Sequence, residues 1–118
     1  SSLQKVLERE DYVVSTAATA EEALQLLEKG TYHVVLTDQK LPGMNGLELL
    51  HIIKERFPAT EVILITGYGT VETAVEAMRE GAYDFISKPF KRIMIVKVVA
   101  KALEKQLLSE ENRFLRSQ

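Results

Sequence analysis

Along the chain, short runs of consecutive apolar residues alternate with longer segments in which apolar residues recur every three or four positions. The short runs are rich in β-branched residues and comprise Val13–Ser15, Val34–Thr37, Val62–Ile65 and Phe85–Ser87. Their apolar residues are continuous and do not alternate with polar ones, which is typical of strands buried on both faces of a parallel sheet. We therefore predict a strand at each run.

The longer segments are predicted to be amphipathic helices with recognisable ends. Thr19–Glu22 has the sequence of a capping box, and the helix that it opens is predicted to end at Gly30. Asn45 is the predicted N-cap of a second helix, with Glu48 three residues later and Pro58 just beyond its end. The apolar residues at helical spacing are Ala23, Leu24 and Leu27 on the inner side of the first helix and Leu47, Leu50, Ile53 and Phe57 in the second.

Three further helices complete the pattern. Thr70 is the predicted N-cap of a helix that ends at Gly81 and carries apolar residues at helical spacing. A long last helix is predicted to start near Lys91 and to run beyond Asn112. Ser1–Glu8 also has helical spacing, so the chain is predicted to begin on a helix.

Strands that alternate with helices across short connections are typical of an α/β fold, a doubly wound parallel sheet with right-handed crossovers. We place the domain at residues 1–104, with its boundary inside the last helix near Glu104. Residues 105–118 are interpreted as a linker helix toward an output domain that this sequence does not contain. A domain of this class normally begins on a strand, whereas this chain begins on a helix.

Composition excludes several classes of site. The chain has 118 residues, of which 46% are hydrophobic and 27% charged, enough for one modest core. A net charge of -2 argues against a nucleic-acid-binding surface. No cysteine is present, so disulfides and zinc–thiolate sites are excluded. His33 and His51 are interpreted as an ordinary strand-edge residue and an ordinary helix-surface residue. No apolar run has membrane-spanning length and no secretory signal opens the chain, so a cytoplasmic location is expected.

Polar residues that follow the predicted strands offer the candidate chemistry. In doubly wound folds ligands bind beyond the carboxyl ends of the strands, where Asp38, Thr66 and Lys88 are expected to meet. A carboxylate can attack phosphorus and form an acyl phosphate, while a hydroxyl and an ammonium group stabilise the phosphoryl oxygens. Taken alone, each residue has a structural explanation, as a turn, cap or surface charge. Their joint placement on three strand ends favours a phosphate site.

Three motifs resemble the receiver domains of two-component response regulators. Thr37–Gly46 resembles the phosphoacceptor loop of these domains, Ile65–Gly69 resembles their hydroxyl position and the following loop, and Tyr83–Phe90 resembles their switch-aromatic and Lys-Pro segment. The motifs occur in the family's order and the resemblance covers nearly the whole chain. It implies the flavodoxin-like receiver fold, with its first strand missing from this sequence.

The resemblance also implies roles for individual residues. Asp38 would accept a phosphoryl group from a sensor histidine kinase or from a small phosphodonor. Thr66 would hydrogen-bond that group and Lys88 would pair with it. Asp38 and the backbone carbonyl of Lys40 would be ligands of Mg²⁺, and Phe85 would be the aromatic switch residue. Phosphorylation would then shift the population between two packings.

Within the family, Thr66–Gly69 and Glu80–Phe85 most resemble receivers of nitrogen-regulator-type (NtrC-like) activators. These activators act on sigma-54 RNA polymerase through an ATPase domain, so the full protein is expected to carry C-terminal ATPase and DNA-binding domains. The implied output face spans residues 70–103.

A seam of apolar residues at helical spacing in the last helix suits a homodimer that forms through the last helices. We expect Ile93–Leu103 to pack on the domain's own sheet and Leu107–Leu115 to act as linker. The seam residues are Ile93, Val96, Ala100, Leu103, Leu107 and Phe114, with Leu108 and Leu115 as a neighbouring stripe.

The sequence departs from the family in one respect. Receiver domains have a first strand followed by an acidic pair that holds Mg²⁺; both are missing here, and Glu10–Asp11 precedes the wrong strand. Ser1 matches the middle of the family's first helix, so we expect the missing part upstream in the natural protein. Alternatively, the chain is truncated and a partner chain swaps in the element. The missing strand is central in the family, so its loss leaves two edges unpaired. We expect the complete domain to bind Mg²⁺ and this fragment to bind it weakly or not at all.

Two other functions remain as alternatives. One is a phosphorylation-independent interaction module of the same fold, which the missing acidic pair keeps open. The other is a flavodoxin-like enzyme or nucleotide binder, which is disfavoured because no glycine-rich phosphate loop follows any predicted strand. The chain is expected to be a regulatory substrate and no enzyme, apart from its own phosphorylation and dephosphorylation.

Overall fold

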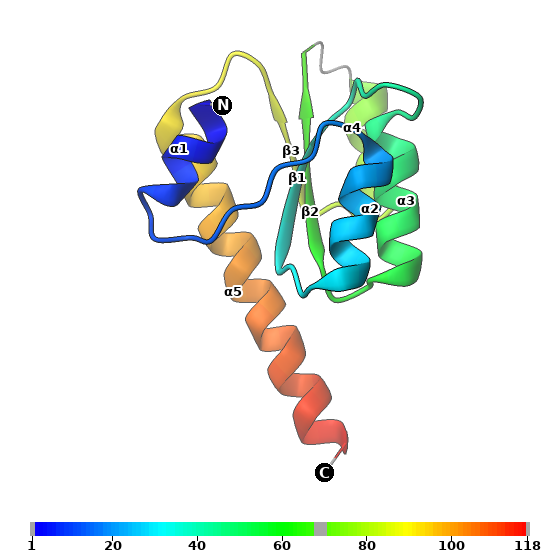
Figure 1. The fold of residues 1–118 in the computed structure, drawn as a ribbon, viewed down its shortest axis with the longest axis vertical. Helices are drawn as coiled ribbons and strands as arrows, with labels where there is room; N and C mark the ends of the chain where they lie inside the picture. The colour runs from blue at the N-terminus through cyan, green and yellow to red at the C-terminus, as the bar shows by residue number, and fades with distance from the viewer. Residues whose placement is uncertain (1, 68–70, 118) are drawn as a thin grey trace.

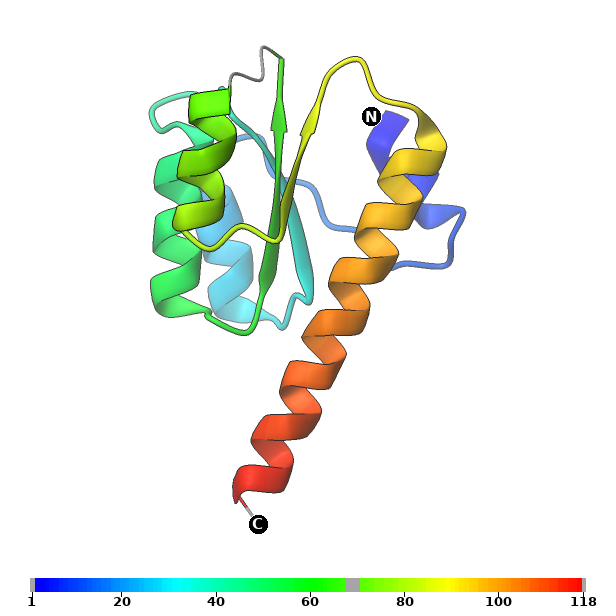
Figure 2. The same cartoon turned by 180° about the vertical axis from the view of Figure 1, so that it is seen from behind.

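The structure, a computed structural model, describes residues 2–67 and 71–117 and has two helical layers around a parallel sheet. The strands are β1 (Val34–Asp38), β2 (Glu61–Thr66) and β3 (Asp84–Ser87), in the order β1-β2-β3. Helices α1 (Ser2–Glu8) and α5 (Arg92–Ser117) lie on one side of the sheet (Figure 1). Helices α2 (Ala20–Lys29), α3 (Gly46–Arg56) and α4 (Val71–Arg79) lie on the other (Figure 2). The predicted doubly wound α/β class is therefore confirmed.

The register of the strands aligns their carboxyl ends. In the pairing of β1 with β2, Asp38 lies opposite Ile65, and in the pairing of β2 with β3, Thr66 lies opposite Ser87. All strands run in the same direction, so the residues that follow them emerge at one edge of the sheet.

Each face of the sheet has its own apolar core. Alternate residues of β2 point to opposite faces, so Val62 and Leu64 pack with α2, α3 and α4, whereas Ile63 packs with α1 and α5. Every residue of β2 is buried, as expected for a central strand covered on both faces.

The predicted helix caps are confirmed where the structure describes them. The backbone N–H of Glu22 donates to Thr19 Oγ1 at 3.2 Å, and the Glu22 carboxylate accepts from the N–H of Ala18 at 2.7 Å. Asn45 Oδ1 accepts from the N–H of Glu48 at 2.8 Å. These bonds satisfy donors that the first turn of a helix leaves free. The predicted cap Thr70 lies outside the described residues.

The predicted strand at Val13–Ser15 is wrong. Residues 12–17 lie between α1 and α2 without regular secondary structure, and the side chain of Val13 is 99% exposed. A strand requires a hydrogen-bonding neighbour. Residues 12–17 and β1 instead line a common pocket of about 1090 Å³, and in the described sheet β1 pairs only with β2.

Helix α5 turns a different stripe toward the sheet from the one expected. The buried residues on its sheet side are Ile95, Val99 and Ala102, whereas Ile93 is 58% exposed and Ala100 is exposed. The stripe that packs on the sheet therefore differs from the predicted seam. Ile93 and Ile95, for example, are two positions apart and so lie on different sides of the helix. The segment Ile93–Leu103 therefore packs on the sheet as expected, but it does so through Ile95, Val99 and Ala102 and not through the predicted seam.

Helix α5 also continues without a break past Glu104, and its end projects away from the sheet (Figure 1). The boundary near Glu104 thus remains a prediction, and the side chains of Phe114 and Leu115 lie outside the part that the structure describes. Within the described residues, no helix is both long and apolar enough to cross a membrane.

Gly46, the first residue of α3, lets this helix approach the end of β1 closely. Its backbone N–H donates to the carbonyl of Gln39 at 2.8 Å. A Cβ atom at Gly46 would lie 2.5 Å from the backbone oxygen of Asp38 and 2.7 Å from Leu64 Cδ1. A methyl group does not fit there without movement of the backbone that carries Asp38.

We therefore expect Gly46→Ala to lower the free energy of unfolding by about 1–3 kcal/mol, the usual cost of overpacking. Urea unfolding followed by circular dichroism measures the change. Gly67→Ala is the matched control, since no heavy atom of the described neighbours lies within 4 Å of a Cβ atom at that position. Equal unfolding midpoints for the two variants would contradict the packing argument.

His51 on α3 contacts two carboxylates. Its Nδ1 lies 2.8 Å from Oε2 of Glu80, the residue that follows α4. Its Nε2 lies 3.1 Å from Oε1 of Glu55. The hydrogen bond with Glu80 and the charge of Glu55 raise the pKa of His51 above 6.5. Protonated His51 therefore links α3 to the end of α4.

Because the folded-state pKa exceeds the unfolded value, this contribution to stability is complete below about pH 6.5 and is lost as pH rises through the folded-state pKa. We expect an NMR titration of the native chain to give a His51 pKa above 6.5. Glu80→Gln should lower this value, whereas the control Glu72→Gln on α4 should not. A native pKa at or below 6.5, or one unaffected by Glu80→Gln, would show that the contact is not formed.

Candidate functional site

A pocket of about 310 Å³ lies at the edge of the sheet where the three strands end. It is lined by the three residues predicted from the strand ends and by four others: Asp38, Gln39, Lys40, Thr66, Gly67, Thr73 and Lys88. The lining comes from β1, β2, the segment after β3 and α4, so residues far apart in the sequence share one site.

Asp38 and Lys88, which both line this pocket, form an ion pair. Lys88 Nζ lies 3.0 Å from Asp38 Oδ2, although the two residues are 50 positions apart in the chain. Both side chains are nearly half exposed. An ion pair so accessible to solvent contributes little to stability, and it leaves the carboxylate open to a ligand.

The hydroxyl of Thr66 is buried beside this pair. Thr66 is 1% exposed, and its Oγ1 has no hydrogen-bond partner among the described residues. Its backbone carbonyl accepts from the N–H of Lys88 at 2.8 Å, which fixes Lys88 next to the end of β2. A buried hydroxyl without a partner is unfavourable and rare, so it needs an explanation. A ligand with acceptor oxygens in the pocket would provide one.

Backbone hydrogen bonds position the loop that follows Asp38. The N–H of Gln39 donates to the carbonyl of Ile65 at 2.8 Å, which extends the pairing of β1 and β2 by one residue. On the other side of the pocket, the Lys88–Pro89 peptide bond is cis.

Two residues of the pocket lining, Gln39 and Thr73, were not predicted from the sequence. Gln39 Oε1 is buried and also lacks a hydrogen-bond partner in the described structure. Its position directly after Asp38 was an available signal. Thr73 comes from α4, and nothing in its spacing marks it, because its place in the pocket depends on how α4 packs.

Phe85, the predicted switch residue, lies within β3 and outside the pocket lining. It is opposite Leu64 in the strand register and is partly buried against the core formed with α2, α3 and α4. It lies one strand away from Thr66, on the face of the sheet that α4 covers.

The described residues do not form a complete Mg²⁺ site. Among them, no group of three or more acidic or histidine side chains could hold a metal ion. Asp38 and Lys40 do line the pocket, but one carboxylate and one carbonyl are a small part of the octahedral oxygen shell that Mg²⁺ requires. In addition, Lys88 already pairs with that carboxylate.

The arrangement as a whole suits a phosphoryl group bound to a carboxylate. Asp38 supplies a nucleophilic oxygen, Lys88 a positive charge 3.0 Å away, and Thr66 a hydroxyl that is free to donate. The described pocket has no glycine-rich cradle for the phosphates of a nucleotide. Its geometry thus favours transfer of a single phosphoryl group.

Comparison with known proteins identifies relatives over almost the whole chain. Residues 1–100 match the family described as response regulator receiver domain. The C4-dicarboxylate transport transcriptional regulatory protein DctD of Rhizobium meliloti is 42% identical over 98% of this chain and 25% of its own length. The chain spans about a quarter of the length of the first curated relatives that it matches.

Solved structures agree with this match. The receiver domain of NtrX from Brucella abortus is 41% identical over 85% of each chain, with a TM-score of 0.81. The beryllofluoride-activated NtrC4 receiver domain dimer is 37% identical, with a TM-score of 0.85 over 89% of this chain and 87% of that chain.

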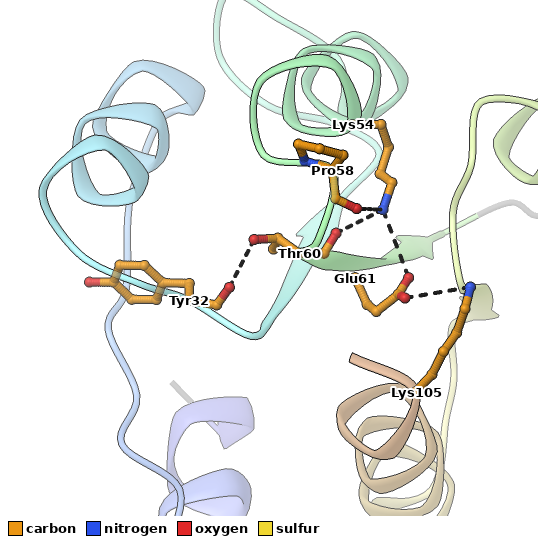
Figure 3. Close-up of polar contacts among 6 residues, drawn as sticks. All are labelled: Tyr32, Lys54, Pro58, Thr60, Glu61 and Lys105. Carbon is orange, nitrogen blue, oxygen red and sulfur yellow. Dashed lines mark hydrogen bonds and ion pairs between the residues drawn. The ribbon is translucent and has the colours of Figure 1, made fainter. Parts of the chain in front are cut away.

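The unpartnered hydroxyl of Thr66 is expected to lower the free energy of unfolding, and removal of this hydroxyl tests that expectation. Thr66→Val keeps the shape of the side chain and removes the buried polar group, so we expect the free energy of unfolding to stay unchanged or to rise slightly. Thr60→Val is the matched control. The hydroxyl of Thr60 donates to the carbonyl of Tyr32 at 2.8 Å (Figure 3). Its loss should cost about 1–3 kcal/mol, because it leaves that carbonyl unpaired.

Urea unfolding of the two variants and the parent chain measures both effects. A loss of stability in Thr66→Val as large as that in Thr60→Val would mean that Thr66 has a partner in the native chain.

Proposed function

Because this chain belongs to the family of response regulator receiver domains, we propose that Asp38 is its phosphoacceptor. The observation that supports this most directly is the meeting of Asp38, Thr66 and Lys88 in one pocket. The sequence relatives are regulators of the NtrC-like type. The sensor histidine kinase is the proposed phosphodonor, and a small acyl phosphate can replace it.

In the proposed reaction, an oxygen of Asp38 attacks phosphorus and forms the new P–O bond. The bond from phosphorus to the leaving group breaks, and the leaving group departs with the electron pair. Lys88 offsets the negative charge of the carboxylate and of the incoming group, and Thr66 donates its hydroxyl to a phosphoryl oxygen. Hydrolysis of the acyl phosphate by water returns the carboxylate. The chain is thus proposed to be a regulatory substrate, with no turnover of a metabolite.

Receiver domains in general bind Mg²⁺, and we propose that Asp38 and the backbone carbonyl of Lys40 contribute to its site. Among the described residues, the pocket lining contains one carboxylate, that of Asp38, and no group of three or more acidic or histidine side chains could hold a metal ion. We therefore propose that the 118-residue chain by itself binds Mg²⁺ weakly.

Phosphorylation is proposed to act on α4 through Thr66. Donation to a phosphoryl group would draw the Thr66 side chain toward the pocket and free space beside Phe85, whose ring would then turn inward. The proposed output face consists of α4, β3 and the first half of α5. Apolar side chains are exposed on both helices of this face, namely Val71, Val75, Met78, Ile93 and Met94. Their repacking would be the population shift that reports phosphorylation.

The full protein is proposed to contain further domains that this receiver controls. We propose that the receiver controls an ATPase domain acting on sigma-54 RNA polymerase in the cytoplasm, with DNA binding by a further domain. Residues beyond Glu104 would form the linker helix of a homodimer. The exposed Leu107 and Leu108 supply apolar surface for that contact.

We expect Asp38→Asn to abolish covalent labelling of the chain by a small acyl phosphate, because an amide is no nucleophile toward phosphorus. Intact-mass spectrometry under native conditions, with and without Mg²⁺, measures the added phosphoryl group. The parent chain should be labelled once, and slowly, since the metal donors are incomplete.

The matched control is Asp11→Asn. Asp11 is an exposed acidic residue with φ of 66°, a conformation that asparagine tolerates. This variant should be labelled like the parent chain. Labelling of Asp38→Asn at the parent rate would refute Asp38 as acceptor and favour the phosphorylation-independent module.

A further inference from the structure

Glu61 is a buried acidic residue at the edge of the sheet opposite the phosphate pocket. It is the first residue of β2 and is only 4% exposed. Burial of a carboxylate is costly unless positive charge compensates it. The proposed phosphoryl chemistry does not use this residue, so its burial requires a separate explanation.

Two lysines from opposite faces of the sheet point at this carboxylate (Figure 3). Lys54 of α3 places its Nζ 3.9 Å from Glu61 Oε1, and Lys105 of α5 places its Nζ 3.4 Å from Oε2. We call these three residues the basal ion cluster. It joins three layers of the fold, namely α3, the sheet and α5.

Lys54 is the fixed member of the cluster. Its ammonium group also donates to the carbonyls of Pro58 at 3.0 Å and Thr60 at 2.9 Å (Figure 3). Burial lowers the pKa of Lys54, while the charge of Glu61 opposes this shift. Its stem passes under the turn after α4, where a Cβ atom at Gly81 would lie 3.3 Å from Lys54 Cγ.

Lys105 on α5 is the exposed member of the cluster. Its Nζ lies 5.7 Å from the centre of the Tyr83 ring, which precedes β3. The next residue, Gln106, is 1% exposed, whereas Leu107 and Leu108 are about half exposed. Beyond this point the helix extends away from the sheet (Figure 2).

The basal ion cluster is poorly suited to a purely stabilising role. Glu61 Oε1 has no hydrogen-bond partner among the described residues, and the lysine distances are those of charge attraction more than of short hydrogen bonds. Apolar residues at such a place would often give equal or greater stability. The cluster can instead set the direction of α5. The buried negative charge of Glu61 attracts the ammonium group of Lys105 and so favours one position of this part of the helix.

We propose that Glu61 is a positioning residue that fixes the direction in which the last part of α5 leaves the sheet. Through Lys54 the carboxylate is linked to the turn after α4, and through Lys105, which lies over the Tyr83 ring, it is linked to the residue before β3. The direction of the linker helix is therefore tied to the elements of the proposed output face. This inference goes beyond phosphorylation of Asp38 and holds for the unphosphorylated chain.

Distance measurements between spin labels test this directly, because the chain has no cysteine of its own. Cysteines replace Gln25 on α2 and Glu111 near the end of α5, both exposed. Pulsed electron paramagnetic resonance then gives the distance distribution. The reference pair is Gln25 with Lys97, which lies on α5 before the cluster and should report no change.

We expect Lys105→Met to broaden or shift the distribution of the Gln25–Glu111 pair and to leave the Gln25–Lys97 pair unchanged. Lys105→Arg should restore the parent distribution, since it keeps the charge. Lys101→Met removes a charge from an exposed position one turn earlier on α5 and should have no effect. Glu61→Gln should broaden the distribution as Lys105→Met does.

Lys105 is more than half exposed, so its variants are expected to fold even where Glu61→Gln does not. The proposal is overturned if Lys105→Met gives the same distribution as Lys101→Met. It is equally overturned if Lys105→Arg is as broad as Lys105→Met, because packing of one particular side chain, and no charge, would then set the direction. All measurements are made without a phosphodonor, so they do not depend on Asp38.

Discussion

The parallel register of the three strands brings side chains that are distant in the sequence to a common edge of the sheet. β2 is central and entirely buried, and its pairing with β1 and β3 sets where the flanking chain segments emerge. Asp38 and Lys88 can form their ion pair only because the ends of β1 and β3 are held on either side of Thr66. The close approach of Gly46 to the backbone of Asp38 places the first residue of α3 directly against the end of β1. Any change in this register would separate the three groups.

The two edges of the sheet carry opposite kinds of polar site. At the carboxyl edge, the charged groups are accessible and a buried hydroxyl has no partner, so the site is incomplete without a ligand. At the amino edge, a buried carboxylate lies between two lysines of the same chain. The first arrangement suits a group that arrives and leaves, and the second suits a permanent anchor. β2 contributes a residue to each, Thr66 at one end and Glu61 at the other, and so connects them through one rigid element.

Local signals in the sequence predicted much of the fold. The caps at Thr19 and Asn45 depend on contacts within four residues, and the central strand is a continuous apolar run, so both were predictable. The strand at Val13–Ser15 failed because strand formation depends on a neighbour, which local sequence does not reveal. The stripe of α5 that packs on the sheet also depends on tertiary contact.

The two polar sites also differ in how far they could be predicted from the sequence, because they depend to different degrees on long-range packing. Asp38, Thr66 and Lys88 follow apolar runs, and the rule that parallel strands share an edge was enough to bring them together. Glu61 gave no such signal, because nothing nearby in the sequence indicates that Lys54 and Lys105 would reach it from opposite faces. Lys105 itself lies in the segment assigned to a linker, outside the predicted domain.

The proposed phosphoacceptor function requires that Asp38, Thr66 and Lys88 surround a single phosphoryl group. A structure of the chain with beryllofluoride, a mimic of that group, tests this most directly. The predicted result is beryllium bonded to an oxygen of Asp38, with Lys88 Nζ and Thr66 Oγ1 both within hydrogen-bond distance of the fluorine atoms. Beryllofluoride bound elsewhere, or at Asp38 with the Thr66 hydroxyl still unpartnered, would contradict it.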